Sequence, residues 1–79
     1  MLSEEELDAA CERFGHAIRV RRTQMRLSMA KTAERAQISY PYLSELERGK
    51  KNPSMDVMRR VAEALDMKLS ELFRMADGE

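Results

Sequence analysis

The sequence predicts an all-α fold in which five helices form one domain over residues 1–79. Apolar residues recur at steps of three and four along most of the chain, which is the spacing of a helix that buries one side. Serines precede four of these apolar segments, and serine is a preferred N-cap residue. An apolar content of 43% in 79 residues is enough for one modest core.

The first helix is expected to begin at Ser3 or Glu4 and to end near Met25. The run Ser3-Glu-Glu-Glu6 matches a capping box, and its acidic side chains lie at the favourable end of the helix dipole. Arg22 interrupts the apolar stripe of this helix. The other members of the stripe are Leu7, Cys11, Phe14, Ile18 and Met25.

The next two predicted helices are short. Ser28 caps a helix that ends at Ala36, with Ala30 and Ala33 as small packing residues. After a tight turn at residues 37–38, Ser39 caps a helix over residues 40–48, and Gly49 suits the left-handed position that ends it. Two short helices joined by about three residues form a helix-turn-helix, here residues 28–48, whose second helix enters the DNA major groove.

Glu47 also lies where an apolar residue is expected, because it continues the inward spacing of Leu43 and Leu46. A lone charge that faces a core is very costly, whereas two opposite charges that meet there are tolerated. We therefore expect the first and third helices to cross, with Arg22 bound to Glu47. Such a pair would fix the angle at which the third helix is presented.

The remaining residues are expected to complete the scaffold. Pro53 and Ser54 end a loop and cap a fourth helix, and residues 66–68 connect it to a short fifth helix that starts at Leu69. Residues 77–79 are expected to fray. The predicted inward positions of the fourth helix are Met55, Met58, Val61, Ala62 and Leu65.

Several spaced elements of the chain resemble the Xre/Cro family of helix-turn-helix regulators, which includes lambdoid phage repressors, restriction-modification controller proteins and many small bacterial regulators. The resemblance covers Phe14 to Phe73 and implies a compact, lambda-repressor-like fold. The family also carries an Arg–Glu pair at the positions of Arg22 and Glu47. The matching elements are Leu27-Ser28, Ile38-Ser39, Tyr42-Leu-Ser-Glu-Leu-Glu-Arg-Gly49, Asn52-Pro-Ser54 and Ala62-Glu-Ala-Leu65.

The resemblance implies that the first, second and sixth residues of the recognition helix read bases. These are Tyr40, Pro41 and Glu45, with Ser44 close by. Glu45 could accept a hydrogen bond from cytosine N4, and Tyr40 could pack on a thymine methyl group or reach a phosphate. Pro41 cannot donate a hydrogen bond, and it leaves the start of this helix uncertain by one residue.

Phosphate contacts are expected at both ends of the helix-turn-helix. Met29 stands where many family members have Gln. Its side chain therefore cannot donate a hydrogen bond to a phosphate, and only its backbone N–H can. Tyr42 is a further candidate, although packing is the favoured role for its ring over base reading. The expected phosphate contacts are Ser28, Met29, Tyr42, Arg48, Lys50 and Lys51.

The formal net charge of zero hides three blocks of different sign. Residues 1–12 carry a net charge of −5, residues 13–51 carry +7 and residues 52–79 carry −2. The positive block coincides with the helix-turn-helix, and phosphate contact requires local rather than overall charge. A merely solvated helix surface is the alternative, and the coincidence favours DNA.

Several classes of function are excluded by composition. No apolar run reaches the ~20 residues that span a membrane, and the acidic N-terminus does not resemble a signal peptide, so we expect a cytoplasmic protein. The single Cys11 cannot form an internal disulfide and is expected to be buried, whereas His16 is expected to be exposed. No nucleophile–base pair, phosphate loop or metal-ligand cluster can be built, so we expect no enzyme, cofactor or metal. The seven methionines favour gap filling in a small core over a partner groove.

These observations predict a transcriptional regulator, acting as a repressor or autoregulator, that binds a two-fold DNA operator as a homodimer. One short recognition helix reads only a few base pairs, and two of them multiply the specificity. The resemblance to controller proteins implies that the last helix forms the dimer interface, although the same residues could close the monomer core. The interface candidates are Leu69, Leu72, Phe73 and Met75.

Two other functions remain open. The chain could be the antitoxin of a toxin–antitoxin pair that regulates its own operon, with the acidic N-terminus as the contact for a basic protein partner. It could also be a protein-interaction adaptor that reuses the fold without binding DNA. An adaptor would lack the basic block that this chain carries.

Overall fold

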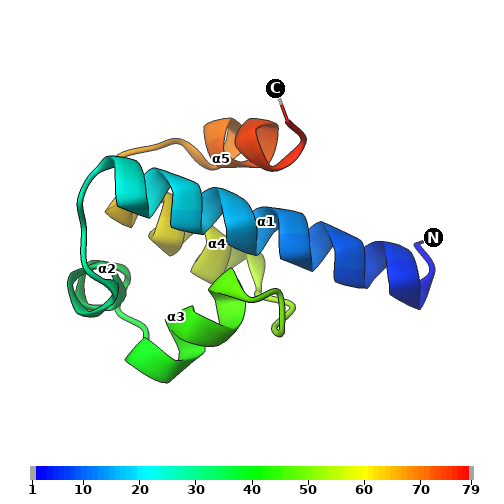
Figure 1. Cartoon of the computed structure of the whole chain (residues 1–79), viewed down its shortest axis with the longest axis horizontal. Coiled ribbons are helices and arrows are strands. Elements are labelled where there is room, and N and C mark those ends of the chain that lie inside the picture. Colours follow the sequence, from blue (N-terminus) through cyan, green and yellow to red (C-terminus); the bar gives the residue numbers. More distant parts are fainter. Residues whose placement is uncertain (1, 79) are drawn as a thin grey trace.

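The computed structural model describes residues 2–78, and five α-helices lie within that span. Figure 1 shows α1 running the length of the molecule, with α5 above it, α2 and α3 below it, and α4 behind it. The all-α prediction is therefore confirmed. The helices are α1 (Glu4–Gln24), α2 (Met29–Ala36), α3 (Tyr40–Glu47), α4 (Met55–Ala64) and α5 (Leu69–Ala76).

Four of the five helices begin at the serines that the sequence indicates. The hydroxyl of each serine accepts a hydrogen bond from the backbone N–H three residues later, at 3.0–3.1 Å. At Ser3 the capping box is complete, because the N–H of Ser3 also donates to Glu6 at 3.2 Å. α5 has no serine cap, and there the N–H of Lys68 donates to the carboxylate of Glu71 at 2.8 Å.

All five helices contribute to the core, with α1 packed on α3 and α5, and α4 packed on α2 and α5. Met55 is 63% exposed and Ala30 is exposed, so the inward positions expected for these two residues were wrong. Both lie in the first turn of their helices, beyond the edge of the core, and the later turns supply the buried positions. The largest fully buried side chains are Ile18, Thr32, Leu43, Leu46, Val61, Leu65 and Leu72.

α5 closes the monomer with Leu72, which is fully buried. Leu72 is therefore not available to a partner, and its expected place in a dimer interface was wrong. A helix of eight residues is stable only when it buries an apolar side, and α5 buries Leu72 against its own chain. Phe73 is 37% exposed, and its ring packs on Phe14 with centroids 5.8 Å apart. The side chains of Leu69 and Met75 are half-buried.

Three helices end at residues in the left-handed conformation that are not glycine. Arg26, Gln37 and Asp66 have φ values of +58°, +58° and +54°. In each turn the following N–H donates to the carbonyl five residues earlier, at 3.0 Å, which is the Schellman pattern of a helix C-terminus. α3 ends in the same way, but there Gly49 takes the left-handed position at φ +73°. Residues 77–79 were expected to fray. Asp77 is the C-cap of α5, and Glu79 lies outside the described residues.

We expect Gln37→Gly to raise the free energy of unfolding by about 0.5–1 kcal/mol, since the left-handed conformation is strained for a residue with a Cβ atom. Gln37 is exposed, so little packing is lost. Chemical denaturation measures the change. Gln37→Ala is the matched control, because alanine keeps the strain; equal stability of the two variants would contradict this account.

Candidate nucleic-acid interface

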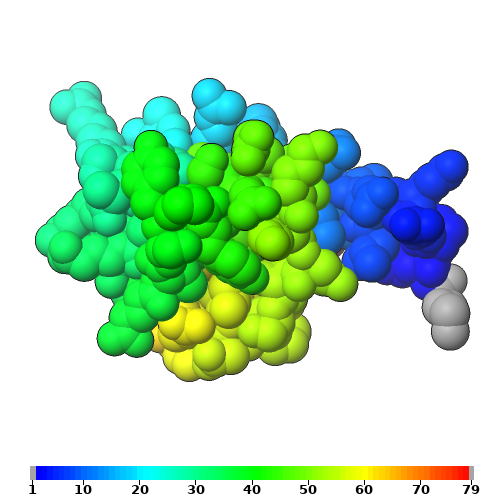
Figure 2. Space-filling model, turned by 90° about the horizontal axis from the view of Figure 1, so that it is seen from below, coloured from blue at the N-terminus to red at the C-terminus, as the bar shows by residue number. Residues whose placement is uncertain are grey.

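The helix-turn-helix leaves one side of α3 open. Leu43 and Leu46 of α3 pack into the core with Ala33 and Ala36 of α2, so the opposite side of α3 faces outward. Figure 2 shows α3 near the middle of the underside of the molecule, with α2 beside it and the first turns of α1 extending beyond the body. The outward side of α3 is therefore free to meet a large ligand.

The four residues expected to read bases lie together on that side. Tyr40 is 53% exposed, Pro41 is exposed, and Ser44 and Glu45 are half-buried. Ser39 is the N-cap of α3, so Pro41 is the second residue of the helix, where a missing N–H costs no hydrogen bond. The register of α3 is therefore the one that places Tyr40 first.

Tyr42 and Met29, two of the expected phosphate contacts, are partly buried against the core. The ring of Tyr42 has a packing role in this position. The side chain of Met29 also packs against the core. The backbone N–H of Met29 belongs to the first turn of α2, where helix N–H groups attract anions. The hydroxyl of Ser28 beside it is exposed while it caps α2.

The cations that follow α3 are exposed and unpaired. Arg48, Lys50 and Lys51 form no ion pair with any carboxylate of residues 2–78. Other cations of the chain are neutralised, as Arg59 is by Asp56 and Glu63 at 2.8–3.0 Å. The loop after the recognition helix therefore carries the positive charge that a phosphate would meet.

Arg22 and Glu47 bind each other between α1 and α3. Nε of Arg22 donates to Glu47 Oε2 at 2.7 Å, and Nη2 donates to Oε1 at 3.1 Å. The side chains of Arg22 and Glu47 are only 16% and 7% exposed. Nη1 of Arg22 also donates to the Leu27 carbonyl at 3.0 Å, which joins the end of α1 to the same pair. The hydrogen bond that Arg22 donates to the Glu47 carboxylate raises the pKa of Arg22.

The pair also affects the charge of α3. Because Glu47 is bound by Arg22, Glu45 is left as the one carboxylate of α3 without a cation partner. A bound phosphate would therefore meet less negative charge than the sequence of α3 suggests.

A second contact between α1 and α3 was missed in the sequence. A Cβ atom on Gly15 would lie 2.1 Å from the carbonyl oxygen of Leu46 and 2.8 Å from that of Glu47, so the two backbones touch. One turn away, a Cβ on Gly49 would lie 2.7 Å from Cα of Glu12. A glycine inside an otherwise regular helical stripe is the signal for such a close approach.

Two arginines bind the C-terminal carbonyls of neighbouring helices, and the sequence did not reveal them. Arg60 of α4 donates to the carbonyls of Ala36 and Gln37 at 3.0 Å, and Arg21 of α1 donates to the carbonyl of Leu65 at 3.0 Å. Cations are favourable at helix C-termini, where carbonyl groups lack partners. These bonds fix α2 relative to α4, and α4 relative to α1.

We expect Glu47→Ala to lower the free energy of unfolding by about 3 kcal/mol, because it leaves the partly buried guanidinium of Arg22 unpaired. The double variant Arg22→Met, Glu47→Leu should recover much of this loss. Chemical denaturation of the three proteins measures both changes. Glu45→Ala, on the exposed side of the same helix, is the control; if Glu47→Ala destabilises no more than this control, the pair does not fix α3.

Two further features of the described residues bear on the kind of site. No helix within residues 2–78 has the length and apolar character needed to cross a membrane. In the same span, no three His, Cys, Asp or Glu side chains come together as ligands for a metal ion.

Comparison with known proteins places this geometry among helix-turn-helix proteins. The sequence model of a helix-turn-helix family matches residues 18–72. An uncharacterised helix-turn-helix-type transcriptional regulator of Mycobacterium tuberculosis, Rv0474, is 42% identical over 59 residues, which is 75% of this chain and 42% of that protein. The chain spans between 40% and 53% of the length of the curated relatives it matches.

Solved structures resemble the whole arrangement of helices. The clp gene regulator ClgR of Corynebacterium glutamicum superposes with a TM-score of 0.84 at 33% identity, over 87% of this chain and 73% of that one. The restriction-modification controller protein C.AhdI of Aeromonas hydrophila superposes with a TM-score of 0.76 at 32% identity, over 78% of this chain and 94% of that one. The lambda-repressor-like arrangement expected from the sequence is thus confirmed.

Proposed function

The chain belongs to the Xre/Cro-type helix-turn-helix family of non-enzymatic regulators, and we propose that it binds double-stranded DNA sequence-specifically to control transcription in the cytoplasm. One observation carries this proposal. The inner side of α3 is fixed on α1, while its outer side is open and followed by three unpaired cations. A rigid helix beside free positive charge suits insertion into the major groove.

Base reading is assigned to the open side of α3. Glu45 has no cation partner in the chain, so its carboxylate is free to accept a hydrogen bond from cytosine N4. Tyr40 is exposed enough to pack on a thymine methyl group, and Ser44 can bond to either partner of a base pair. Pro41 contributes apolar contact only.

Phosphate binding is assigned to the two ends of the motif. At the start of α2, the hydroxyl of Ser28 and the N–H of Met29 bind one phosphate. After α3, Arg48, Lys50 and Lys51 bind phosphates of the opposite DNA strand. Tyr42 contributes through packing. The unpaired cations also favour DNA over the adaptor function, because a protein-interaction domain has no need of them.

We assign the protein as a repressor or autoregulator that binds a two-fold operator as a homodimer. A single α3 of eight residues reads few base pairs, and a second copy about 34 Å away raises the specificity to that of an operator. The half-buried Leu69 and Met75 and the exposed part of Phe73 are the residues of α5 that a partner could cover.

We expect Lys50→Ala and Lys51→Ala to weaken binding to all DNA sequences alike. Each lost phosphate contact should lower the slope of log K against log salt concentration by about one unit. Titrations at several salt concentrations, with a random duplex and a selected site, measure this slope. Lys68→Ala, which removes an exposed cation at the start of α5, is the matched control; an equal effect of the control would contradict the assigned contacts.

We expect Glu45→Gln to change the preferred base at one position in each half-site, because an amide that can donate replaces an acceptor-only carboxylate. Selection of binding sites from a random DNA pool, with the wild type and the variant side by side, shows this change. An identical consensus from both proteins would remove Glu45 from the base-reading residues.

A further inference from the structure

One edge of α1 follows α3 and the loop after it. Gly15 and Arg22 of this edge contact α3. Glu12 lies against Gly49 at the start of the loop. Residues three and four apart share one side of a helix. The edge therefore consists of Glu5, Asp8, Glu12, Gly15, Arg19 and Arg22.

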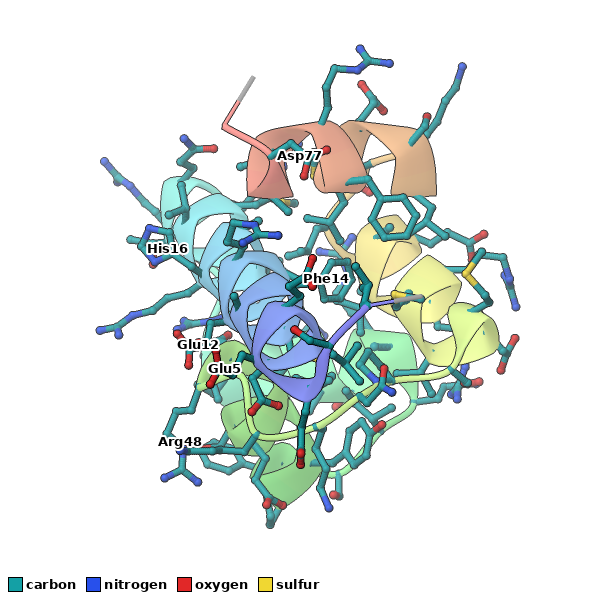
Figure 3. The ribbon with its side chains drawn as sticks, turned by 90° about the vertical axis from the view of Figure 1, so that its right-hand side faces the viewer. Glu5, Glu12, Phe14, His16, Arg48 and Asp77 are labelled. Carbon is teal, nitrogen blue, oxygen red and sulfur yellow. The ribbon has the colours of Figure 1, made fainter. Side chains whose placement is uncertain are left out.

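The charge of this edge changes sign at Gly15. The three side chains before it are carboxylates, and the two after it are arginines. Figure 3 looks along α1 from its N-terminal end and shows Glu5 and Glu12 on the same side of the molecule as Arg48. In the first half of α1, a phosphate close to this edge would therefore meet negative charge. In the second half it would meet positive charge.

The end of α1 carries two arginines that no carboxylate of the described chain neutralises. Arg19 is exposed, and so is Arg26, which follows the last residues of the helix. Neither forms an ion pair within residues 2–78, whereas Arg22 between them is bound to Glu47. Arginine suits phosphate, because its charge is permanent and its planar group offers several N–H donors.

Arg26 has an unfavourable backbone conformation. Its φ is +58°, in the left-handed region that is strained for a residue with a Cβ atom. Its exposed guanidinium forms no ion pair in return with any residue of the described span. Arginine thus stands where glycine would make the fold more stable. A residue that lowers the stability of its own fold is a candidate for binding a ligand.

Arg26 lies next to the proposed phosphate contacts at the start of α2. The carbonyl of Leu27 accepts a hydrogen bond from Arg22 at 3.0 Å, and Arg22 also binds Glu47, so this turn is fixed against the end of α3. Ser28 comes two residues after Arg26, and their Cα atoms are therefore at most about 7 Å apart. Figure 2 shows the end of α1 at the rim of the face that carries α3.

We propose that the DNA-binding surface continues from the helix-turn-helix onto the end of α1, where Arg19 and Arg26 contact phosphates of the strand that Ser28 and Met29 bind. This contact rests on the proposed DNA binding and adds to it residues outside the helix-turn-helix motif. The carboxylates on the first half of the edge repel phosphates, so contact with α1 is confined to its basic end. Phosphate contacts fix the orientation of a protein on the duplex, and these two orient α1 relative to one strand.

Arg19→Ala and Arg26→Ala should each weaken binding to random and selected duplexes alike. One lost phosphate contact lowers the slope of log K against log salt concentration by about 0.9, which is about an 8-fold loss of affinity at about 0.1 M salt. Titrations at several salt concentrations measure the slope, and circular dichroism checks the fold. Arg13→Ala is the matched control, because Arg13 is an exposed arginine of the same helix that lines a groove with Phe73 of α5.

Replacement of Arg26 by glycine separates DNA binding from stability. Arg26→Gly relieves the left-handed strain, so its denaturation midpoint should rise, while its affinity for DNA should fall as far as that of Arg26→Ala. Arg26→Lys keeps the charge and should keep the salt slope of the wild type. A glycine variant that is more stable and binds DNA as tightly as the wild type would overturn the contact.

The outcomes separate this contact from the proposed function. If Lys50→Ala lowers the salt slope and neither arginine variant does, α1 does not touch the duplex, although the function stands. If the arginine variants weaken binding to the selected site but not to the random duplex, the two side chains act on sequence preference, and their assignment to phosphates is wrong. If the wild type shows no salt-dependent binding to any duplex, the contact and the proposed function both fail.

Discussion

The crossing of α1 over α3 is the constraint on which the candidate DNA-binding surface depends. Two contacts of different kinds fix it: Arg22 binds Glu47 at 2.7 and 3.1 Å, and Gly15 lets the two backbones touch. The ion pair sets the angle, because a two-point bond has only one favourable orientation. The glycine contact sets the distance, because any side chain there would push the helices apart. Since α3 has only eight residues, its orientation comes from these contacts rather than from its own stability.

Two sets of basic residues have different roles in this small protein. Arg21, Arg22 and Arg60 are bound to backbone carbonyls at or just after helix ends, where they join neighbouring elements. Arg48, with Lys50 and Lys51, stays unpaired at the loop after α3. A net charge of zero is therefore compatible with DNA binding, because phosphate contact depends on the local charge of that loop rather than on the sum over the chain.

The helix boundaries could be predicted because their causes are local. Ser28, Ser39 and Ser54 each act on a backbone N–H three residues away, and no distant part of the chain is involved. The outward side of α3 followed from helical spacing, which places Pro41 and Glu45 on the side away from Leu43 and Leu46. The errors at Met55 and Leu72 have the opposite origin. An apolar residue at helical spacing can face the core, a partner or solvent, and only the position of the other helices decides which.

The sequence by itself determined the five helices, their four serine caps and the two charges that had to meet, since periodicity and local hydrogen bonding act within a few residues. The tertiary structure alone decided the rest. It brought Gly15 against the carbonyl of Leu46, buried Leu72 inside the monomer and gathered Leu7, Cys11 and Phe73 into one groove. No local sequence pattern predicts contacts between residues so far apart in the chain, because these contacts depend on how whole helices pack.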